Sequence, residues 1–166
     1  MLKVGIGFDA HAFATASNSG DKLILGGVAV PYIRSLVAHS DGDVVVHAVI
    51  DSLAGVCLGK DIGQLFPDSD VKYKGADSIK LLEEVVSLVN KEGYKVSNTD
   101  VVIIAQEPKM SPHVSAMCER LAHALNVELS SVSVKATTTE YLGFTGRKEG
   151  IAAVAVSMVE KVVFYS

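Results

Sequence analysis

The segment from residue 43 to residue 59 constrains the fold most, because it is a helix-length apolar stretch crossed by a single polar line. Val, Leu and Ala dominate it, and Gly59 is a typical helix stop. Asp43, His47 and Asp51 follow at intervals of four, so they lie along one face of the expected helix. Burying such groups without partners costs about 1–3 kcal/mol each. Other parts of the chain must therefore supply partners to this line.

The rest of the pattern predicts an α+β fold. Alternating or continuous apolar runs predict strands at 2–8, 23–33 (with a Gly-Gly irregularity), 100–106, 132–136 and 150–164. Further helices are expected along the apolar stripe from Ile79 to Val89, and after Ser111 as N-cap with Pro112 at the first helical position. Asp41 and Asp43 can both cap the central helix, and residues 14–22 and 60–76 read as loops. This order predicts a two-layer sandwich, a mixed β-sheet with helices on one face, forming one domain over residues 1–166.

Composition excludes several classes of protein and favours an oligomer. The 166 residues are 49% hydrophobic and 20% charged, yet no apolar run has the roughly 18 residues of a membrane helix. The apolar surplus therefore predicts a subunit interface. A net charge of −4 argues against nucleic-acid binding. Cys57 and Cys118 fall in apolar patterns and are expected to be core thiols in a reducing cytoplasm.

Asp9, His11 and His47 form a candidate metal site. Asp9 and His11 are two apart on an extended segment, so their side chains point the same way. Seating His47 beside them gives a ligand set suited to Zn²⁺, with Mn²⁺ or Co²⁺ possible and one coordination position open. Asp51, one helical turn along, could orient a ligating imidazole without binding the metal itself. The alternative is a core histidine with satisfied hydrogen bonds and an aspartate that only caps a turn.

Two further segments suit phosphate binding. His39 and Ser40 precede a helix N-terminus, where backbone N–H groups attract anions. Residues 135–147, KATTTEYLGFTGR, combine hydroxyls, glycines and basic groups, and Glu140 could hold Mg²⁺. The alternative for the Thr run alone is a turn between two strands.

Residues 105–111, AQEPKMS, form a loop between a buried strand and a helix. Such loops often hold a base or a phosphate through main-chain groups. Lys109 is as well explained by a solvated charge as by a ligand contact.

Taken together, these segments resemble the 2-C-methyl-D-erythritol 2,4-cyclodiphosphate synthase family. The matching motifs run in the family's order from residue 5 to about residue 155: GFDAHAF, LILGGVAVPY, LVAHSDGDVVVHAVIDSL, DIGQLFPDSD, YKGADS, DVVIIAQEPKM and VKATTTEYLGFTGRKEGIAA. The resemblance implies a homotrimer with active sites between adjacent subunits. It also implies a location in the bacterial cytoplasm, or in the plastid stroma for a processed form.

The resemblance assigns roles to individual residues. Asp9, His11 and His47 would hold Zn²⁺, and Glu140 would hold Mg²⁺ or Mn²⁺ on the substrate diphosphate. His39 and Thr138 would stabilise the transition state. The implied substrate-binding residues are Ser40, Asp61, Ile62, Gly63, Phe66, Asp68, Asp70, Ala105, Gln106, Glu107, Pro108, Lys109, Met110, Ser111, Thr137, Thr138, Phe144 and Arg147. Phe8, Arg147 and Glu149 would surround the three-fold axis, where a channel could bind an isoprenoid phosphate.

The implied reaction converts 4-diphosphocytidyl-2-C-methyl-D-erythritol 2-phosphate to the 2,4-cyclodiphosphate and CMP. It is a lyase step of non-mevalonate isoprenoid biosynthesis. Two alternatives remain: a zinc-dependent phosphohydrolase with Glu140 as base, and a non-catalytic trimer that binds isoprenoid phosphates.

Overall fold

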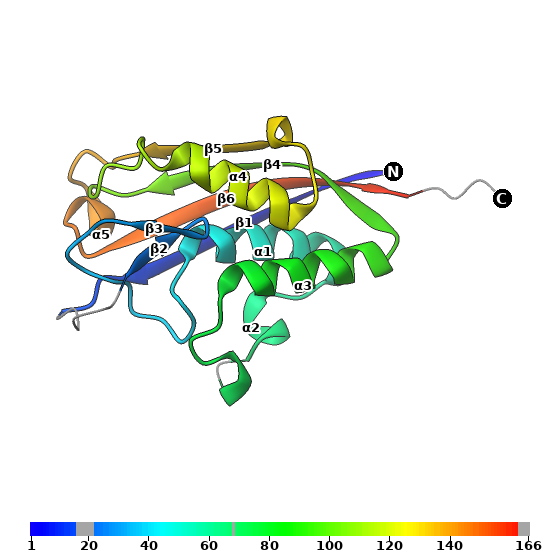
Figure 1. The fold of residues 1–166 in the computed structure, drawn as a ribbon, viewed down its shortest axis with the longest axis horizontal. Coiled ribbons are helices and arrows are strands. Elements are labelled where there is room, and N and C mark those ends of the chain that lie inside the picture. Colours follow the sequence, from blue (N-terminus) through cyan, green and yellow to red (C-terminus); the bar gives the residue numbers. More distant parts are fainter. Residues whose placement is uncertain (16–21, 68, 163–166) are drawn as a thin grey trace.

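A four-stranded mixed sheet forms one layer of the molecule (Figure 1). The structure is a computed structural model and describes residues 1–15, 22–67 and 69–162. The strands lie in the order β1 (Leu2–Ala12), β6 (Gly150–Lys161), β4 (Tyr94–Ile104) and β5 (Val132–Thr137). The β4–β5 pair is parallel and the other two pairs are antiparallel. The predicted α+β class with a mixed sheet is therefore confirmed.

The first strand is longer than predicted. It pairs with β6 along its whole length, up to His11 opposite Ile151 and Ala12 opposite Gly150. Asp9 and His11 therefore lie within β1, and not beyond its end as the predicted 2–8 strand implied. β4 likewise begins at Tyr94, six residues before the predicted start, because its early residues pair with the end of β6.

The predicted strand at 23–33 is a two-stranded hairpin instead. β2 (Leu23–Leu25) and β3 (Val28–Val30) pair antiparallel around Gly26 and Gly27, both of which have positive φ. Two successive residues of this kind make a tight hairpin turn that reverses the chain. The Gly-Gly irregularity was thus the turn itself. The predicted loop at residues 14–22 falls mainly on residues 16–21, which lie outside the described residues.

Three main helices pack against the sheet: α1 (Val44–Leu58), α3 (Ser78–Lys91) and α4 (Val114–Leu125). The sequence signals for α1 are confirmed, because Asp43 caps its start and Gly59 ends it in the left-handed conformation. Asp41 does not cap α1; its carboxylate binds Ser78 at the start of α3. Val85, Val89 and their neighbours on the α3 stripe are buried as predicted.

The start of α4 differs from the prediction. Residues 111–113 form a turn in which the His113 N–H donates to the Met110 carbonyl oxygen, and regular helical bonding begins with Met117 to His113. Val114 is thus the first helical residue, with His113 and not Ser111 at the N-cap. Short helices also interrupt the predicted 60–76 loop: α2 (Ile62–Leu65) and η1 (Val71–Tyr73). Two more, η2 (Leu129–Ser131) and α5 (Gly143–Gly146), lie later in the chain.

The helices lie on one face of the sheet, and the opposite face of β1 carries exposed apolar side chains. Leu2, Val4, Ile6 and Phe8 alternate along β1 and are between 57% and 71% exposed. Both cysteines are free and partly buried against the hydrophobic core. Within the described residues, none of the helices has the length and apolar character needed to cross a membrane.

Candidate metal centre

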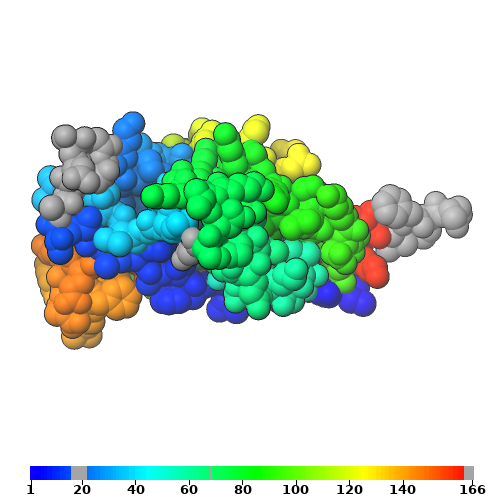
Figure 2. All heavy atoms as spheres, turned by 90° about the horizontal axis from the view of Figure 1, so that it is seen from below, coloured from blue at the N-terminus to red at the C-terminus, as the bar shows by residue number. Residues whose placement is uncertain are grey.

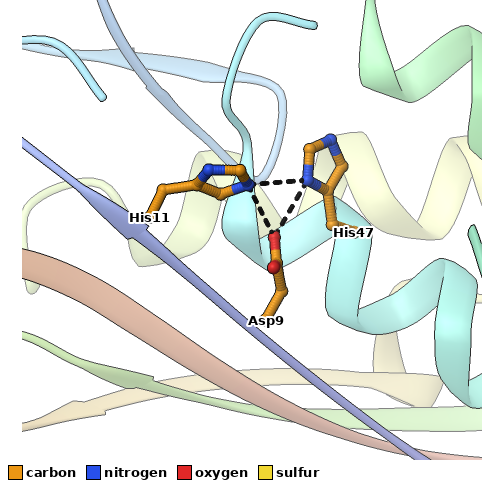
Figure 3. A group of neighbouring side chains, drawn as sticks. All are labelled: Asp9, His11 and His47. Atoms are coloured by element: carbon orange, nitrogen blue, oxygen red, sulfur yellow. Dashed lines mark hydrogen bonds and ion pairs between the residues drawn. The ribbon is translucent and has the colours of Figure 1, made fainter. Parts of the chain in front are cut away.

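Asp9, His11 and His47 come together as the sequence predicts (Figure 3). Asp9 Oδ2 lies 3.0 Å from His11 Nε2 and 2.9 Å from His47 Nδ1. The two imidazole nitrogens are 3.3 Å apart. One ligand atom from each residue lies within 4.8 Å of the others, an arrangement that could hold one metal ion.

Two glycines on β1 let helix α1 come close enough to bring His47 to this point. A Cβ on Gly7 would lie 1.9 Å from the Ala48 carbonyl oxygen, and one on Gly5 equally close to the Ser52 carbonyl oxygen. The helix backbone therefore rests directly on the strand backbone. Any larger residue at either position would push His47 away from β1.

A hydrogen bond fixes which nitrogen of His11 faces the cluster. His11 Nδ1 lies 2.8 Å from the Val37 carbonyl oxygen. A carbonyl oxygen only accepts, so Nδ1 carries a proton, and Nε2 is the nitrogen whose lone pair would bind a metal ion. That lone pair points toward Asp9 and His47, as metal coordination requires.

The carboxylate of Asp9 is held in its ionised form. Burial raises its pKa, but hydrogen bonds from His11 and His47, and their charges, outweigh burial and bring the pKa well below the ordinary value. Binding of a metal ion would displace the imidazole protons that make these hydrogen bonds. An ionised carboxylate beside two imidazoles is a donor set typical of a divalent cation.

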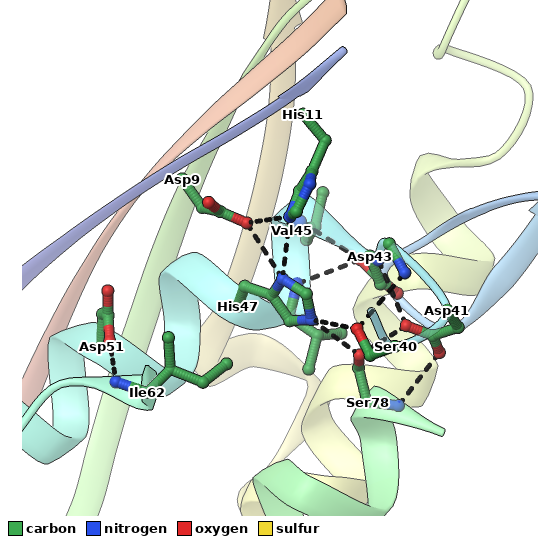
Figure 4. Close-up of polar contacts among 12 residues, drawn as sticks. Asp9, His11, Ser40, Asp41, Asp43, Val45, His47, Asp51, Ile62 and Ser78 are labelled. Carbon is green, nitrogen blue, oxygen red and sulfur yellow. Dashed lines mark hydrogen bonds and ion pairs between the residues drawn. The ribbon is translucent and has the colours of Figure 1, made fainter. Parts of the chain in front are cut away.

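Serine hydroxyls flank the other edge of His47 (Figure 4). His47 Nε2 lies 2.9 Å from Ser78 Oγ and 3.1 Å from Ser40 Oγ. No role for Ser78 is predicted from the sequence. Its only signal was its place in the YKGADS motif, directly before a helix.

The three residues of the predicted polar line, Asp43, His47 and Asp51, have different partners in the structure. Asp43 is fully buried and accepts hydrogen bonds from the backbone N–H groups of Gly26, Gly27, Val45 and Val46. Burial raises its pKa to about 6, although these hydrogen bonds lower it. The carboxylate thus ties the β2–β3 hairpin to the start of the helix that carries His47.

The role predicted for Asp51 is wrong. Its Oδ1 accepts from the Ile62 backbone N–H at 2.7 Å, and His47 has other partners on both ring nitrogens. Burial raises the pKa of Asp51. The residue positions α2 and does not orient an imidazole.

The cluster opens into a cavity of about 200 Å³. Four predicted substrate residues share its wall with the metal cluster and His39: Ser40, Ile62, Gly63 and Phe66. His39 Nε2 is buried and has no hydrogen-bond partner among the described residues. Ala38, Tyr73 and Leu81 also line the cavity, and sequence reasoning missed them. Asp61 caps α2 and Asp70 caps η1, at the edge of this region, while Asp68 lies outside the described residues.

The remaining predicted site residues do not line this cavity in the single chain. Residues 105–111 and 137–149 form a second group, joined by the Ala105 N–H to the Thr137 carbonyl oxygen and the Tyr141 N–H to Gln106 Oε1. Figure 2 shows residues near 140, in orange, at one end of the face whose centre is formed by the green residues near 75.

Within the second group most side chains of residues 137–149 are exposed, whereas Ala105 and Met110 are buried. Thr138 Oγ1 donates to Glu140 Oε1 at 3.2 Å, and Arg147 pairs with Glu149 at 2.8 Å. Glu107 pairs with Lys148 and accepts from the Tyr32 hydroxyl, which holds the 105–111 loop against two other segments. Phe144 is partly exposed beside them.

Fold and cluster together define an α+β protein with an Asp–His–His site for a divalent metal, open to a cavity on one side. Comparison with known proteins identifies the group more closely. The YgbB family matches residues 2–160. The chain belongs to this family.

Curated relatives match nearly end to end. The 2-C-methyl-D-erythritol 2,4-cyclodiphosphate synthase of Pasteurella multocida is 54% identical over 161 residues, covering 97% of this chain and 99% of the relative. The synthase of Vibrio campbellii is 52% identical with the same coverage.

Solved structures agree. The bifunctional IspDF of Campylobacter jejuni superposes with a TM-score of 0.90 at 39% identity, covering 97% of this chain and 42% of that larger protein. The CDP complex of IspF from Plasmodium falciparum gives a TM-score of 0.83 at 32% identity, covering 98% and 97%.

Proposed function

We propose that this protein is a metal-dependent phosphorus–oxygen lyase that converts 4-diphosphocytidyl-2-C-methyl-D-erythritol 2-phosphate to 2-C-methyl-D-erythritol 2,4-cyclodiphosphate and CMP. The observation that carries the proposal is the Asp9–His11–His47 cluster at the wall of a cavity. It occurs in a chain more than half identical, over nearly its whole length, to synthases of that name.

The donor set fits Zn²⁺. Two imidazole nitrogens and one carboxylate oxygen supply three of the four tetrahedral positions, and His11 already presents the correct nitrogen. Mn²⁺ and Co²⁺ accept the same donors. A bound ion would supply Lewis-acid stabilisation of charge on phosphoryl oxygens.

The chemistry asks little of the protein beyond binding and orientation. An oxygen of the 2-phosphate forms a bond to the β-phosphorus of the same substrate, and the bond from that phosphorus to the CMP oxygen breaks. The nucleophile is already an anion, so no protein base is required. An anion attacks an anion, so the site must offset charge and hold a folded substrate.

Residues around the cavity suit that task. His39 Nε2 is buried with no partner among the described residues, so it can bond a phosphate oxygen. Ser40 shares the cavity wall and can do the same. Phe66 packs edge-on against Tyr73, with ring centroids 5.2 Å apart, and forms an apolar wall for the methylerythritol carbons.

The second group of residues would bind the nucleotide. Residues 105–111 with Thr137 and Thr138 would hold cytidine, and Asp61 would lie near the ribose. A structural relative, IspF of Plasmodium falciparum, forms a complex with CDP, which supports a cytidine nucleotide as ligand. Glu140 would hold Mg²⁺ or Mn²⁺ on the diphosphate, since that ion favours one or two carboxylates plus phosphate oxygens. The group lies outside the cavity of its own chain, so a neighbouring subunit would bring it to the metal.

A homotrimer explains the exposed apolar face of β1. Leu2, Val4, Ile6 and Phe8 are an apolar row on a face that the described helices leave open. Such rows usually mark protein interfaces. Packing three copies around this face would bury the row and place one active site at each subunit boundary. Phe8, Arg147 and Glu149 would then approach the three-fold axis, where an isoprenoid phosphate could bind; a cytoplasmic location remains a prediction.

Phosphorus NMR of the reaction products tests the proposal. The protein is incubated with the cytidyl diphosphate substrate, Zn²⁺ and Mg²⁺. The expected products are CMP and a cyclic diphosphate, and His47→Ala should give none while keeping the wild-type assembly. CMP with an open-chain diphosphate would indicate a phosphohydrolase, and the absence of turnover in the wild type would indicate a binding protein.

A further inference from the structure

The second ring nitrogen of His47 faces two hydroxyls, but it can make only one strong hydrogen bond. Ser78 Oγ is the nearer at 2.9 Å, and Ser40 Oγ lies at 3.1 Å (Figure 4). Ser78 is fully buried at the start of α3, whereas Ser40 is half-buried in the cavity wall. The two serines therefore differ in how firmly they are held.

Asp41 fixes the orientation of Ser78. The Ser78 hydroxyl donates to Asp41 Oδ1, and the Ser78 backbone N–H donates to Oδ2 at 2.9 Å. With its proton directed at the carboxylate, the Ser78 hydroxyl can offer His47 only a lone pair. Ser40 has no comparable anchor among the described contacts; its Oγ accepts a long bond, 3.4 Å, from the Gly42 N–H.

Backbone hydrogen bonds hold Asp41 and Ser78 in place although they are distant in sequence. The Gly75 N–H donates to the His39 carbonyl oxygen at 2.9 Å, and the Asp41 N–H donates to the Ala76 carbonyl oxygen at 3.2 Å. The loop before α1 and the turn before α3 therefore form one unit. This unit therefore holds the hydrogen-bonded series Asp41–Ser78–His47 in a fixed arrangement.

We propose that Ser78 and Asp41 are positioning residues that keep the His47 proton on Nε2 and leave the Nδ1 lone pair for the metal. The inference rests on the proposed metal role of the triad. Polar partners behind a ligating imidazole commonly fix its tautomer and ring orientation. Ser40, which is not needed for this purpose, remains available to a ligand in the cavity.

Zinc affinity without substrate is the first test. Zn²⁺ is titrated into metal-free protein against a chromophoric chelator. Ser78→Ala should raise the zinc Kd about 10–100-fold, the usual effect of losing such a partner. Ser52→Ala is the matched control, because Ser52, on α1, is also fully buried and its hydroxyl lies 2.6 Å from Ser157 Oγ, not from His47. Its removal should leave the zinc Kd within about twofold of the wild type, as expected for a site that does not share partners with the metal ligands.

Nitrogen-15 NMR of histidine-labelled, zinc-loaded wild type is the second test, and it needs no Ser78 variant to fold. The signals of His47 are identified by their loss in His47→Ala. The proposal expects a protonated Nε2, with weaker protection of that proton from solvent exchange in Asp41→Asn. A protonated Nδ1 in the wild type, or an unchanged zinc Kd in folded Ser78→Ala, would overturn the inference and leave the metal centre standing. Absence of zinc binding by the wild type would overturn the metal centre itself.

Discussion

Gly7 is the position where a single added methyl group should disturb both folding and the metal site. A Cβ there would lie 1.9 Å from the Ala48 carbonyl oxygen and 2.7 Å from the Ser52 backbone nitrogen. Reaching an ordinary 3.4 Å contact requires α1 to retreat from β1 by about 1.5 Å, and backbone atoms cannot rotate aside as a side chain can. Such overpacking costs about 1–3 kcal/mol, and we expect Gly7→Ala near the upper end.

The same displacement should weaken zinc binding. His47 lies on α1 one residue before Ala48, and its Nδ1 is 2.9 Å from Asp9 Oδ2 on β1. Metal–ligand distances tolerate deviations of only about 0.2 Å, so we expect the zinc Kd to rise at least about tenfold.

Urea unfolding at fixed protein concentration and zinc titration measure the two effects. Gly55→Ala is the control, because Gly55 lies on the same helix and a Cβ there meets nothing within 4 Å. Alanine should stabilise the helix at that position by up to about 1 kcal/mol and leave zinc affinity unchanged. A Gly7→Ala protein with wild-type stability and zinc affinity would refute the claim that direct backbone contact between β1 and α1 sets the geometry of the site.

Three further outcomes follow from the contacts described. Asp43→Ala leaves four backbone N–H groups without their acceptor and should lower the free energy of unfolding by at least about 2 kcal/mol, with Asp43→Asn intermediate; urea unfolding checks this. Hydrogen bonds to His11 and His47 lower the pKa of Asp9 against the effect of burial, so its stabilising contribution is complete above the unfolded value of 3.8 and is lost as pH falls below it. Metal-free wild type should therefore lose its stability advantage over Asp9→Asn between roughly pH 5 and pH 2, and a constant advantage over that range would contradict the assignment. Ile6→Asp should convert the proposed trimer to a monomer in sedimentation velocity, while Val71→Asp on η1, at a position that is 81% exposed against 71% for Ile6, should not.

Local signals explain what could be predicted from sequence. The caps of α1 and the buried stripe of α3 depend on neighbouring residues, and both agree with the structure. The ligand triad could also be predicted from the sequence, because Asp9 and His11 are two apart on a strand and His47 is the central residue of a polar line on a helix.

Contacts between distant segments explain what was missed. The Gly26–Gly27 turn looked like an irregular strand, because the backbone N–H groups of these glycines donate to Asp43, which lies far along the chain at the start of α1. Asp51 was predicted to contact an imidazole from helical spacing alone, but its partner is the backbone N–H of Ile62, the first residue of α2. Ser78 had no signal of its own because His47 and Asp41 reach it only after α3 folds back on the 39–42 loop.

The fate of solvent oxygen tests the central claim most directly. The reaction is run in ¹⁸O-enriched water with Zn²⁺ and Mg²⁺, and both products are examined by mass spectrometry. Intramolecular attack by the 2-phosphate consumes no water, so we predict that neither CMP nor the cyclic diphosphate acquires the heavy isotope during turnover. One ¹⁸O atom in CMP or in an open-chain diphosphate would contradict cyclisation and show that the Asp9–His11–His47 site hydrolyses its substrate.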